Sequence, residues 1–173
     1  MEDYRATPEG TRYQLIEGEL IMSPSPNRFH QDIVWNLVGI LTDFLKTHRV
    51  GKAYVAPFDV YLTEHNVFQH DVLFVAAENL ERFADDGLHG PPDLAIEVLS
   101  PSTAQLDKKN KRRVYAQVGV KELWLVDPLL LQIQVYDFSR DSAKPVALIE
   151  ENETFQTPLL PGLNVAAAEI FKR

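Results

Sequence analysis

The sequence contains no cysteine, which excludes disulfide bonds, thiolate nucleophiles and zinc–thiolate centres. It also lacks a run of the roughly 18 apolar residues that a membrane-spanning helix needs, and its first residues have no signal-peptide pattern. We therefore expect a cytoplasmic protein without a membrane segment. A positive net charge is missing too, since the formal charge is −8. This negative net charge argues against general nucleic-acid binding, which usually needs a basic domain. A local basic patch is still compatible with a negative net charge.

The composition is that of an ordinary globular protein. The chain has 173 residues, of which 45% are apolar and 24% charged, enough for one domain over residues 1–173 with a sizeable core. Apolar residues between positions 30 and 46 recur at helical spacing, which predicts a helix of about four turns. A second helix is expected from a cap at Ser102 or Thr103 to about Val118, with Gly119 ending it. A short closing helix is expected over residues 166–171.

The remaining patterns predict strands. Residues 13–22 are typical of a hairpin with its turn at Glu17-Gly18. Further strands are expected at residues 53–62, 71–76, 94–99, 122–127 and 132–138. This order predicts an α/β fold with an αβββαβ core, in which one mixed sheet carries helices on both faces and an N-terminal hairpin is added.

The most informative segment runs from Gly90 to Thr103. It is an apolar strand that contains two acids, Asp93 and Glu97, and a basic run, Lys108 to Arg113, follows it. Alternate residues of a strand share a face, so positions 93, 95, 97 and 99 lie together. A carboxylate between Ile96 and Val98 is costly to bury without a partner, and a metal ion is the best candidate for that partner.

Asp71 is the expected second ligand. If the strands at 71–76 and 94–99 pair antiparallel, the start of the first lies beside the end of the second, so that Asp71 approaches Glu97. Asp93 lies about 13 Å from Glu97 along the strand. Two carboxylates with several waters suit Mg²⁺, or Mn²⁺, which activates water and stabilises charge on a phosphate oxygen.

A lysine is expected at the same site. Lys111, Val114, Tyr115 and Val118 form one helical stripe, and the valines should face the core. Lys111 should therefore lean over the sheet, where its ammonium group could position water or offset phosphate charge. Lys108, one turn earlier, is the substitute candidate.

The chain resembles the Uma-type restriction-endonuclease-like family of the PD-(D/E)XK nuclease superfamily from about residue 13 to 171. The similarity is carried by Tyr13-Gln-Leu-Ile-Glu-Gly-Glu-Leu20, Ser23-Pro24 with His30, Asp71-Val-Leu-Phe-Val75, Pro92-Asp-Leu-Ala-Ile-Glu-Val-Leu-Ser-Pro-Ser102, Lys111 with Tyr115, Gly119-Val120 and Trp124-Leu-Val-Asp-Pro128.

The resemblance implies a restriction-endonuclease-like core and magnesium-dependent cleavage of DNA phosphodiesters. It puts the superfamily's second-strand acid at Asp71, its (D/E)XK acid at Glu97 and an early acid at Glu19, and it gives His30 a family-typical place without a role. The sequence departs at Leu99, where the superfamily has its lysine, so that Lys111 must replace it. It also has His70 where proline usually precedes the aspartate. A homodimer is expected because two sites serve the two strands of a duplex.

Simpler interpretations exist for each residue. Asp71 could cap a turn, Glu97 and Lys111 could form a structural ion pair, and Asp93 could be a turn or capping residue. Glu19 and the basic run could be solvated surface, with the run balancing Asp107 and Glu122, and His30 could be structural. The rival functions are a catalytically inactive nuclease-fold module that binds nucleic acid or protein, and a phosphodiesterase acting on smaller nucleotides.

Overall fold

The computed structural model describes residues 1–8, 11–101 and 104–173. Its helical segments are α1 (Glu2–Arg5), α2 (Arg28–Thr47), the 3₁₀ segment η1 (Ala77–Arg82), the π-helical segment η2 (Leu106–Lys111), α3 (Arg112–Val118) and α4 (Ala167–Ile170). Helix α2 confirms the helix predicted from the apolar spacing of residues 30–46. The predicted caps at Ser102 and Thr103 lie outside the described residues. In the described part, no helix is both long and apolar enough to cross a membrane.

The main sheet has the strand order β12-β11-β10-β9-β6-β3. Its strands are β3 (Gly51–Val55), β6 (Val72–Ala76), β9 (Leu94–Val98), β10 (Glu122–Asp127), β11 (Gln132–Asp137) and β12 (Ala147–Glu150). Strands β9 and β10 run parallel, whereas β6 pairs with β3 and β9 antiparallel. This sheet contains the αβββαβ order that the sequence predicts.

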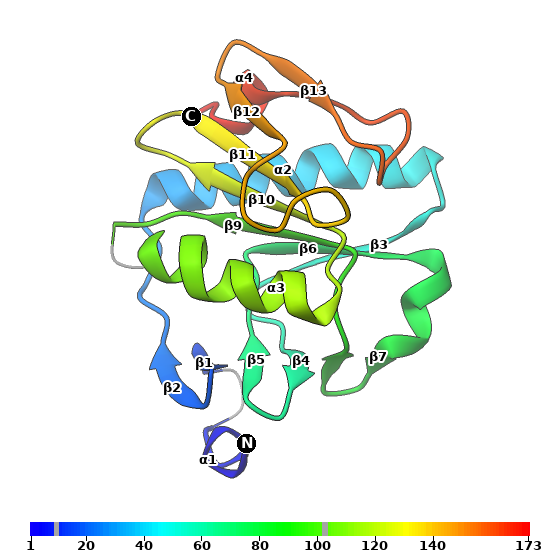
Figure 1. The fold of residues 1–173 in the computed structure, drawn as a ribbon. Coiled ribbons are helices and arrows are strands. Elements are labelled where there is room, and N and C mark those ends of the chain that lie inside the picture. The colour runs from blue at the N-terminus through cyan, green and yellow to red at the C-terminus, as the bar shows by residue number, and fades with distance from the viewer. Residues whose placement is uncertain (9–10, 102–103) are drawn as a thin grey trace.

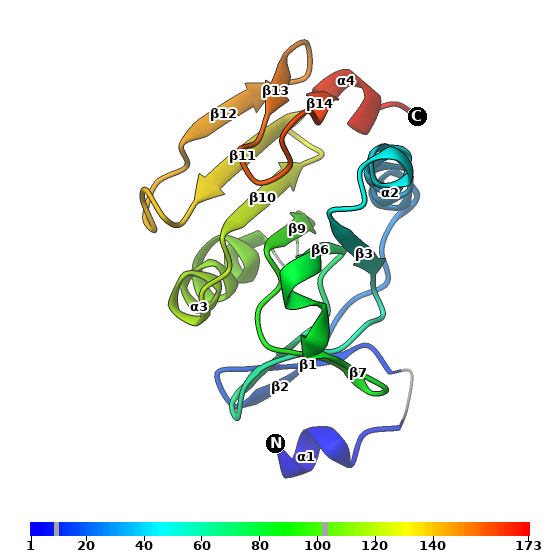
Figure 2. The same cartoon turned by 90° about the vertical axis from the view of Figure 1, so that its right-hand side faces the viewer.

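Helices cover the two faces of this sheet, as Figures 1 and 2 show. In β9, Leu94, Ile96 and Val98 pack in the core beneath α2. Ala95 and Leu99 pack instead with Val114 and Tyr115 of α3. The alternation of β9 therefore turns Glu97, which shares the face of Ala95, toward α3.

A second sheet, with the order β2-β1-β5-β4-β8-β7, lies below the first in Figure 1. It consists of β1 (Tyr13–Ile16), β2 (Glu19–Met22), β4 (Val60–Thr63), β5 (Asn66–Phe68), β7 (Phe83–Ala84) and β8 (Gly87–His89), while β13 (Thr154–Gln156) and β14 (Asn164–Ala166) form a separate pair. The predicted hairpin is confirmed, with Glu17 and Gly18 both at positive φ in its turn. Glycine adopts such a φ without strain.

Two predictions about the sheets are wrong. The expected strand over residues 53–62 is divided into β3 and β4, which belong to different sheets. Pro57 lies between them, and proline cannot donate a hydrogen bond to a ladder, so the strand cannot continue through it. The single expected sheet is accordingly two sheets, and the chain crosses between them at residues 56–59 and again at residues 69–71.

Candidate active site

Two acids converge where β6 and β9 lie side by side. The antiparallel register pairs Val72 with Ile96, which places Asp71 opposite Glu97. The Asp71 carboxylate reaches β9 directly, because the Val98 amide donates to its Oδ2 at 2.8 Å. The predicted pairing of these strands is confirmed, and it brings Asp71 and Glu97 to the same end of two neighbouring interior strands.

Lys111 leans over the sheet from the last position of η2. Its side chain is 3% exposed, and its Nζ lies 3.1 Å from Glu97 Oε1 and 3.2 Å from Asp107 Oδ1. The Tyr115 hydroxyl donates to the same Glu97 oxygen. Glu97 is therefore held from the helix side by a lysine and a tyrosine. The π-helical turn is itself notable, since such turns often occur at functional sites.

The electrostatics of this cluster follow from three acids that share one lysine. Burial raises the pKa of Glu97 to about 8, against the opposing effect of Lys111, and the charges of Asp107 and Asp71 raise it further. Burial alone would lower the pKa of Lys111, but Glu97 and Asp107 outweigh it and the pKa is raised. Lys111 therefore stays an ammonium at neutral pH, and burial favours the protonated form of Glu97.

Two histidines flank the acids. His30, in the first turn of α2, places Nε2 3.3 Å from Asp71 Oδ2, and its Nδ1 is buried without a hydrogen-bond partner. Burial lowers the pKa of His30, but the hydrogen bond and charge of Asp71 outweigh it and raise the pKa. His70 is fully buried against the Tyr115 ring, and neither of its ring nitrogens has a partner. Burial holds the pKa of His70 well below its usual value, so this ring is neutral.

The three acids of the cluster, Lys111 and His30 line a cavity of about 490 Å³ at the junction of the two sheets, whereas His70 is not among the lining residues. One wall carries Asp71, Glu97, Asp107 and Lys111, with His30 beside them. The facing wall comes from β1, β2 and the strap formed by residues 23–27, and it includes Arg12, Gln14, Ile21 and Met22. The strap joins the hairpin to α2, where the Asn27 side chain caps the helix by accepting from the His30 amide.

The sequence model of the Uma2 family, described as "Putative restriction endonuclease", matches residues 1–168. The chain belongs to the Uma2 family. The Uma2 fold is also seen in a crystal structure described as "a putative nuclease belonging to DUF820 from Anabaena variabilis ATCC 29413". The two share 20% sequence identity and a TM-score of 0.79, with coverage of 98% of this chain and 96% of that one. At this identity the likeness concerns the fold, and it confirms the predicted nuclease-like α/β class. No curated protein matches the sequence.

The donor set of this Uma2 site suits a divalent cation. Glu97 uses only Oε1 for Lys111 and Tyr115, and Asp71 uses only Oδ2 for Val98 and His30, so each acid has a second oxygen without a hydrogen bond among the described residues. Magnesium accepts one or two carboxylates and completes its shell with water. Within residues 1–8, 11–101 and 104–173, no three acidic or histidine side chains form a ready-made metal site. A cation would thus be held by Asp71, Glu97 and water.

Three other candidates lie outside this cavity. Glu19 is exposed on β2 and is not among the cavity-lining residues, so the hairpin does not bring it to the acids. Asp93, at the other end of β9, accepts hydrogen bonds from the Ala76 amide and the Asn79 side chain and pairs with Lys121 at 2.8 Å. This structural role agrees with the turn-or-capping interpretation.

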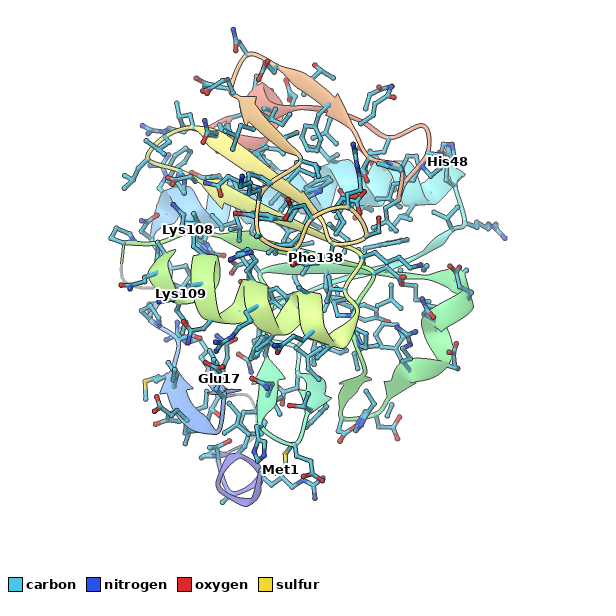
Figure 3. All side chains as sticks on the ribbon, viewed as in Figure 1. Met1, Glu17, His48, Lys108, Lys109 and Phe138 are labelled. Carbon is cyan, nitrogen blue, oxygen red and sulfur yellow. The ribbon has the colours of Figure 1, made fainter. Side chains whose placement is uncertain are left out.

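Lys108 does not share the stripe of Lys111. Its Nζ lies 3.3 Å from Oδ2 of Asp127, the last residue of β10. Figure 3 shows Lys108 with Lys109 at the N-terminal end of the helix that carries Lys111. The prediction assumed α-helical spacing, but hydrogen bonds in a π-helix run from i to i+5, so the residue three positions earlier turns away.

Sequence reasoning missed Asp107, whose side chain is as buried as those of Glu97 and Lys111. The sequence interpretation treated Asp107 and Glu122 as charges balanced by a solvated basic run, and both prove to be buried. The available indication was the spacing of Asp107 and Lys111, since an acid four residues before a lysine forms a helical ion pair. Tyr115 was placed on the stripe but was not assigned its contact with Glu97.

Proposed function

We propose that this Uma2 protein is a metal-dependent endonuclease that hydrolyses DNA phosphodiester bonds. Asp71 and Glu97 would hold Mg²⁺ or Mn²⁺, and Lys111 would contact the substrate phosphate. The observation that carries the proposal is that two carboxylates from neighbouring strands and a buried lysine line one wall of the same cavity. The family description and the nuclease-like fold support the same reaction class.

The chemistry of the residues agrees with phosphodiester hydrolysis. A bound divalent cation supplies Lewis acidity and a more acidic water. Lys111 has three donors, of which Glu97 and Asp107 each take one, so one N–H stays available for a phosphate oxygen. Because its pKa is raised, Lys111 would act as a fixed positive charge rather than as a base. His30 would hold the Asp71 carboxylate in position through Oδ2.

The test uses two circular substrates, supercoiled plasmid and single-stranded circular DNA, with Mg²⁺ or Mn²⁺. The wild-type protein should cut at least one of them, and Glu97→Gln should abolish cleavage with its thermal unfolding intact. Glu151→Gln is the matched control, since Glu151 is exposed between β12 and β13. Equal cleavage by Glu97→Gln and wild type would refute the site assignment. The expected homodimer stays a prediction, which sedimentation can test.

A non-catalytic binding module is the second candidate. The contacts of Lys111 with Glu97 and Asp107 form a closed buried network, which explains all three residues without any reaction. Titration with Mn²⁺ separates the two proposals. An endonuclease site should bind Mn²⁺, and Glu97→Gln should weaken that binding. Absence of binding at millimolar metal, together with absence of cleavage, would favour the module.

A further inference from the structure

The acids of the site are enclosed rather than displayed on a surface. The side chains of Glu97 and Lys111 are 4% and 3% exposed, and that of Asp71 is 22% exposed. A cavity of about 490 Å³ falls in the range of small-ligand pockets, roughly 300–1,000 Å³. In a double helix each phosphate is flanked by the rest of the duplex, whose major groove alone is about 12 Å wide. Acids enclosed in this way are more accessible to a phosphate of a single strand than to a phosphate within a duplex.

The wall that faces the acids is fixed in place. The Arg12 guanidinium donates to the Pro24 carbonyl and to Ser25 Oγ, at 3.4 and 2.9 Å, and Gln14 donates to Ser23 Oγ at 2.6 Å. These bonds hold the strap of residues 23–27 against the second sheet. The strap is therefore a wall of the cavity that hydrogen bonds hold in place.

The hairpin is also tied to the helix that carries Lys111. Glu17, in the β1–β2 turn, forms an ion pair with Arg113 and accepts a hydrogen bond from Asn110 at 2.8 Å. Figure 3 shows Glu17 below this helix. The two contacts join the second sheet to the helix.

The charges do not provide a track for a duplex. A protein that binds duplex DNA tightly neutralises several phosphates, about 6–10 in strong binders. The basic run after β9 is instead largely paired within the protein, with Lys108 on Asp127, Lys111 on two acids and Arg113 on Glu17. In the described part of the cavity lining, Arg12 is the permanent cation that is not ion-paired, and its guanidinium has donors to spare for one phosphate.

The apolar part of the cavity lining suits contact with the face of an unpaired base. Met22 is 61% exposed although it is a large apolar residue, and it lines the cavity next to Ile21 and the prolines of the strap. Such a surface offers apolar contact to the flat face of any base, which is how single strands are bound without regard to sequence. Unpaired bases also enter an enclosed pocket without the cost of a few kcal/mol that extrusion from a duplex requires.

We infer that the strand cut at this site is unpaired, so that the substrate is single-stranded DNA. One nucleotide enters the cavity, its base lies against Met22 and Ile21, and its neighbouring phosphate contacts Arg12. This inference rests on the proposed function, because it names the substrate of the same site.

The experiment measures binding of a fluorescein-labelled 30-nucleotide DNA to Glu97→Gln protein by anisotropy, with the strand free or annealed to its complement. The free strand should bind at least tenfold more tightly. Adding Met22→Glu should weaken that binding at least tenfold, because a negative charge would enter the cavity. Leu130→Glu is the matched control, because it changes the net charge by the same amount as Met22→Glu. Leu130 is 62% exposed and lies outside the cavity lining.

Equal or tighter binding of the duplex would overturn the inference, and so would equal effects of Met22→Glu and Leu130→Glu, which would indicate general repulsion. With wild-type protein and metal, the single-stranded circle should be cut at least tenfold faster than relaxed duplex circles. If neither circle is cut, the proposed function fails, whereas the binding measurements still decide which form of DNA the cavity accepts.

Discussion

If Asp71 and Glu97 hold a divalent cation, the affinity of the site for Mn²⁺ must depend on pH through Glu97. Burial raises the pKa of Glu97 to about 8, so the carboxyl group is largely protonated at neutral pH. A carboxyl group must lose its proton to bind a metal, and metal binding therefore competes with that proton. About 1% of the Glu97 groups are ionised at pH 6 and about half at pH 8, so the Kd for Mn²⁺ should fall about 50-fold between these values.

The assay is isothermal titration calorimetry of chelator-treated protein with Mn²⁺ at pH 6, 7, 8 and 9. Repeating each titration in two buffers with different ionisation enthalpies gives the number of protons released. The part of this number that comes from Glu97 should approach one at pH 6 and fall toward zero at pH 9, and it adds to any proton lost by His30, which contacts Asp71. Glu97→Gln should bind Mn²⁺ weakly and without the steep pH dependence, whereas Glu151→Gln should follow the wild type.

A Kd that changes less than about threefold from pH 6 to 8, with no proton released, would refute the reasoning. It would mean either that Glu97 is ionised in the folded protein or that it does not bind the metal. The glutamine variant separates these cases, because its affinity falls below that of the wild type only if Glu97 is a ligand.

Three further predictions concern stability, each measured by urea unfolding. Folding raises the pKa of Glu97 from 4.5 to about 8, so the proton bound to Glu97 stabilises the folded state fully below pH 4.5, and this stabilisation is lost as the pH rises through 8. Glu97→Gln should therefore be more stable than wild type at pH 9, by at most about 5 kcal/mol, and should lose this advantage at acid pH. Lys111→Met should cost about 3–5 kcal/mol at pH 8 because it leaves two buried acids without a cation, and adding Glu97→Gln and Asp107→Asn should restore most of the loss; a single variant as stable as wild type would show that the acids are already neutral. Asp93→Asn should cost about 2 kcal/mol, since it removes a charged acceptor for the Ala76 amide and a partner of Lys121, with Mn²⁺ affinity unchanged; a weakened affinity would place Asp93 in the site after all.

The candidate site could be predicted from the sequence where strand and helix periods apply. The alternation around Glu97 predicted which face it occupies, and the antiparallel pairing of its strand brought Asp71 to it. The helical stripe with Val114 and Tyr115 likewise predicted that Lys111 leans inward, and it is buried. These inferences succeeded because each depends on a backbone repeat that one sequence displays.

What could not be predicted depends on contacts between distant segments. Strands β5, β7 and β8 have three residues or fewer, too few to show an alternating pattern, so the second sheet was not expected. Lys108 was assigned to the wrong face because nothing in the residue pattern announced the π-helical turn. Asp107 was taken for a solvated charge because a buried acid and an exposed acid look alike until their partners are known.

The second sheet changes the meaning of the site, because it supplies the wall that faces the acids. Asp71 stands where the chain passes from β5 in the second sheet to β6 in the main sheet. The backbone N–H of Gln69, two residues earlier, donates to the side-chain oxygen of Gln14 on β1. The position of Asp71 is therefore fixed by both sheets at once. A core of αβββαβ order alone would leave Asp71 and Glu97 at an open end of strands β6 and β9, which duplex DNA could approach. The second sheet and its strap enclose that end in a cavity, so the substrate preference should reside in the second sheet and the hydrolytic chemistry in the main sheet. Substitutions such as Met22→Glu should accordingly alter DNA binding with Mn²⁺ affinity intact, whereas Glu97→Gln should alter Mn²⁺ affinity first.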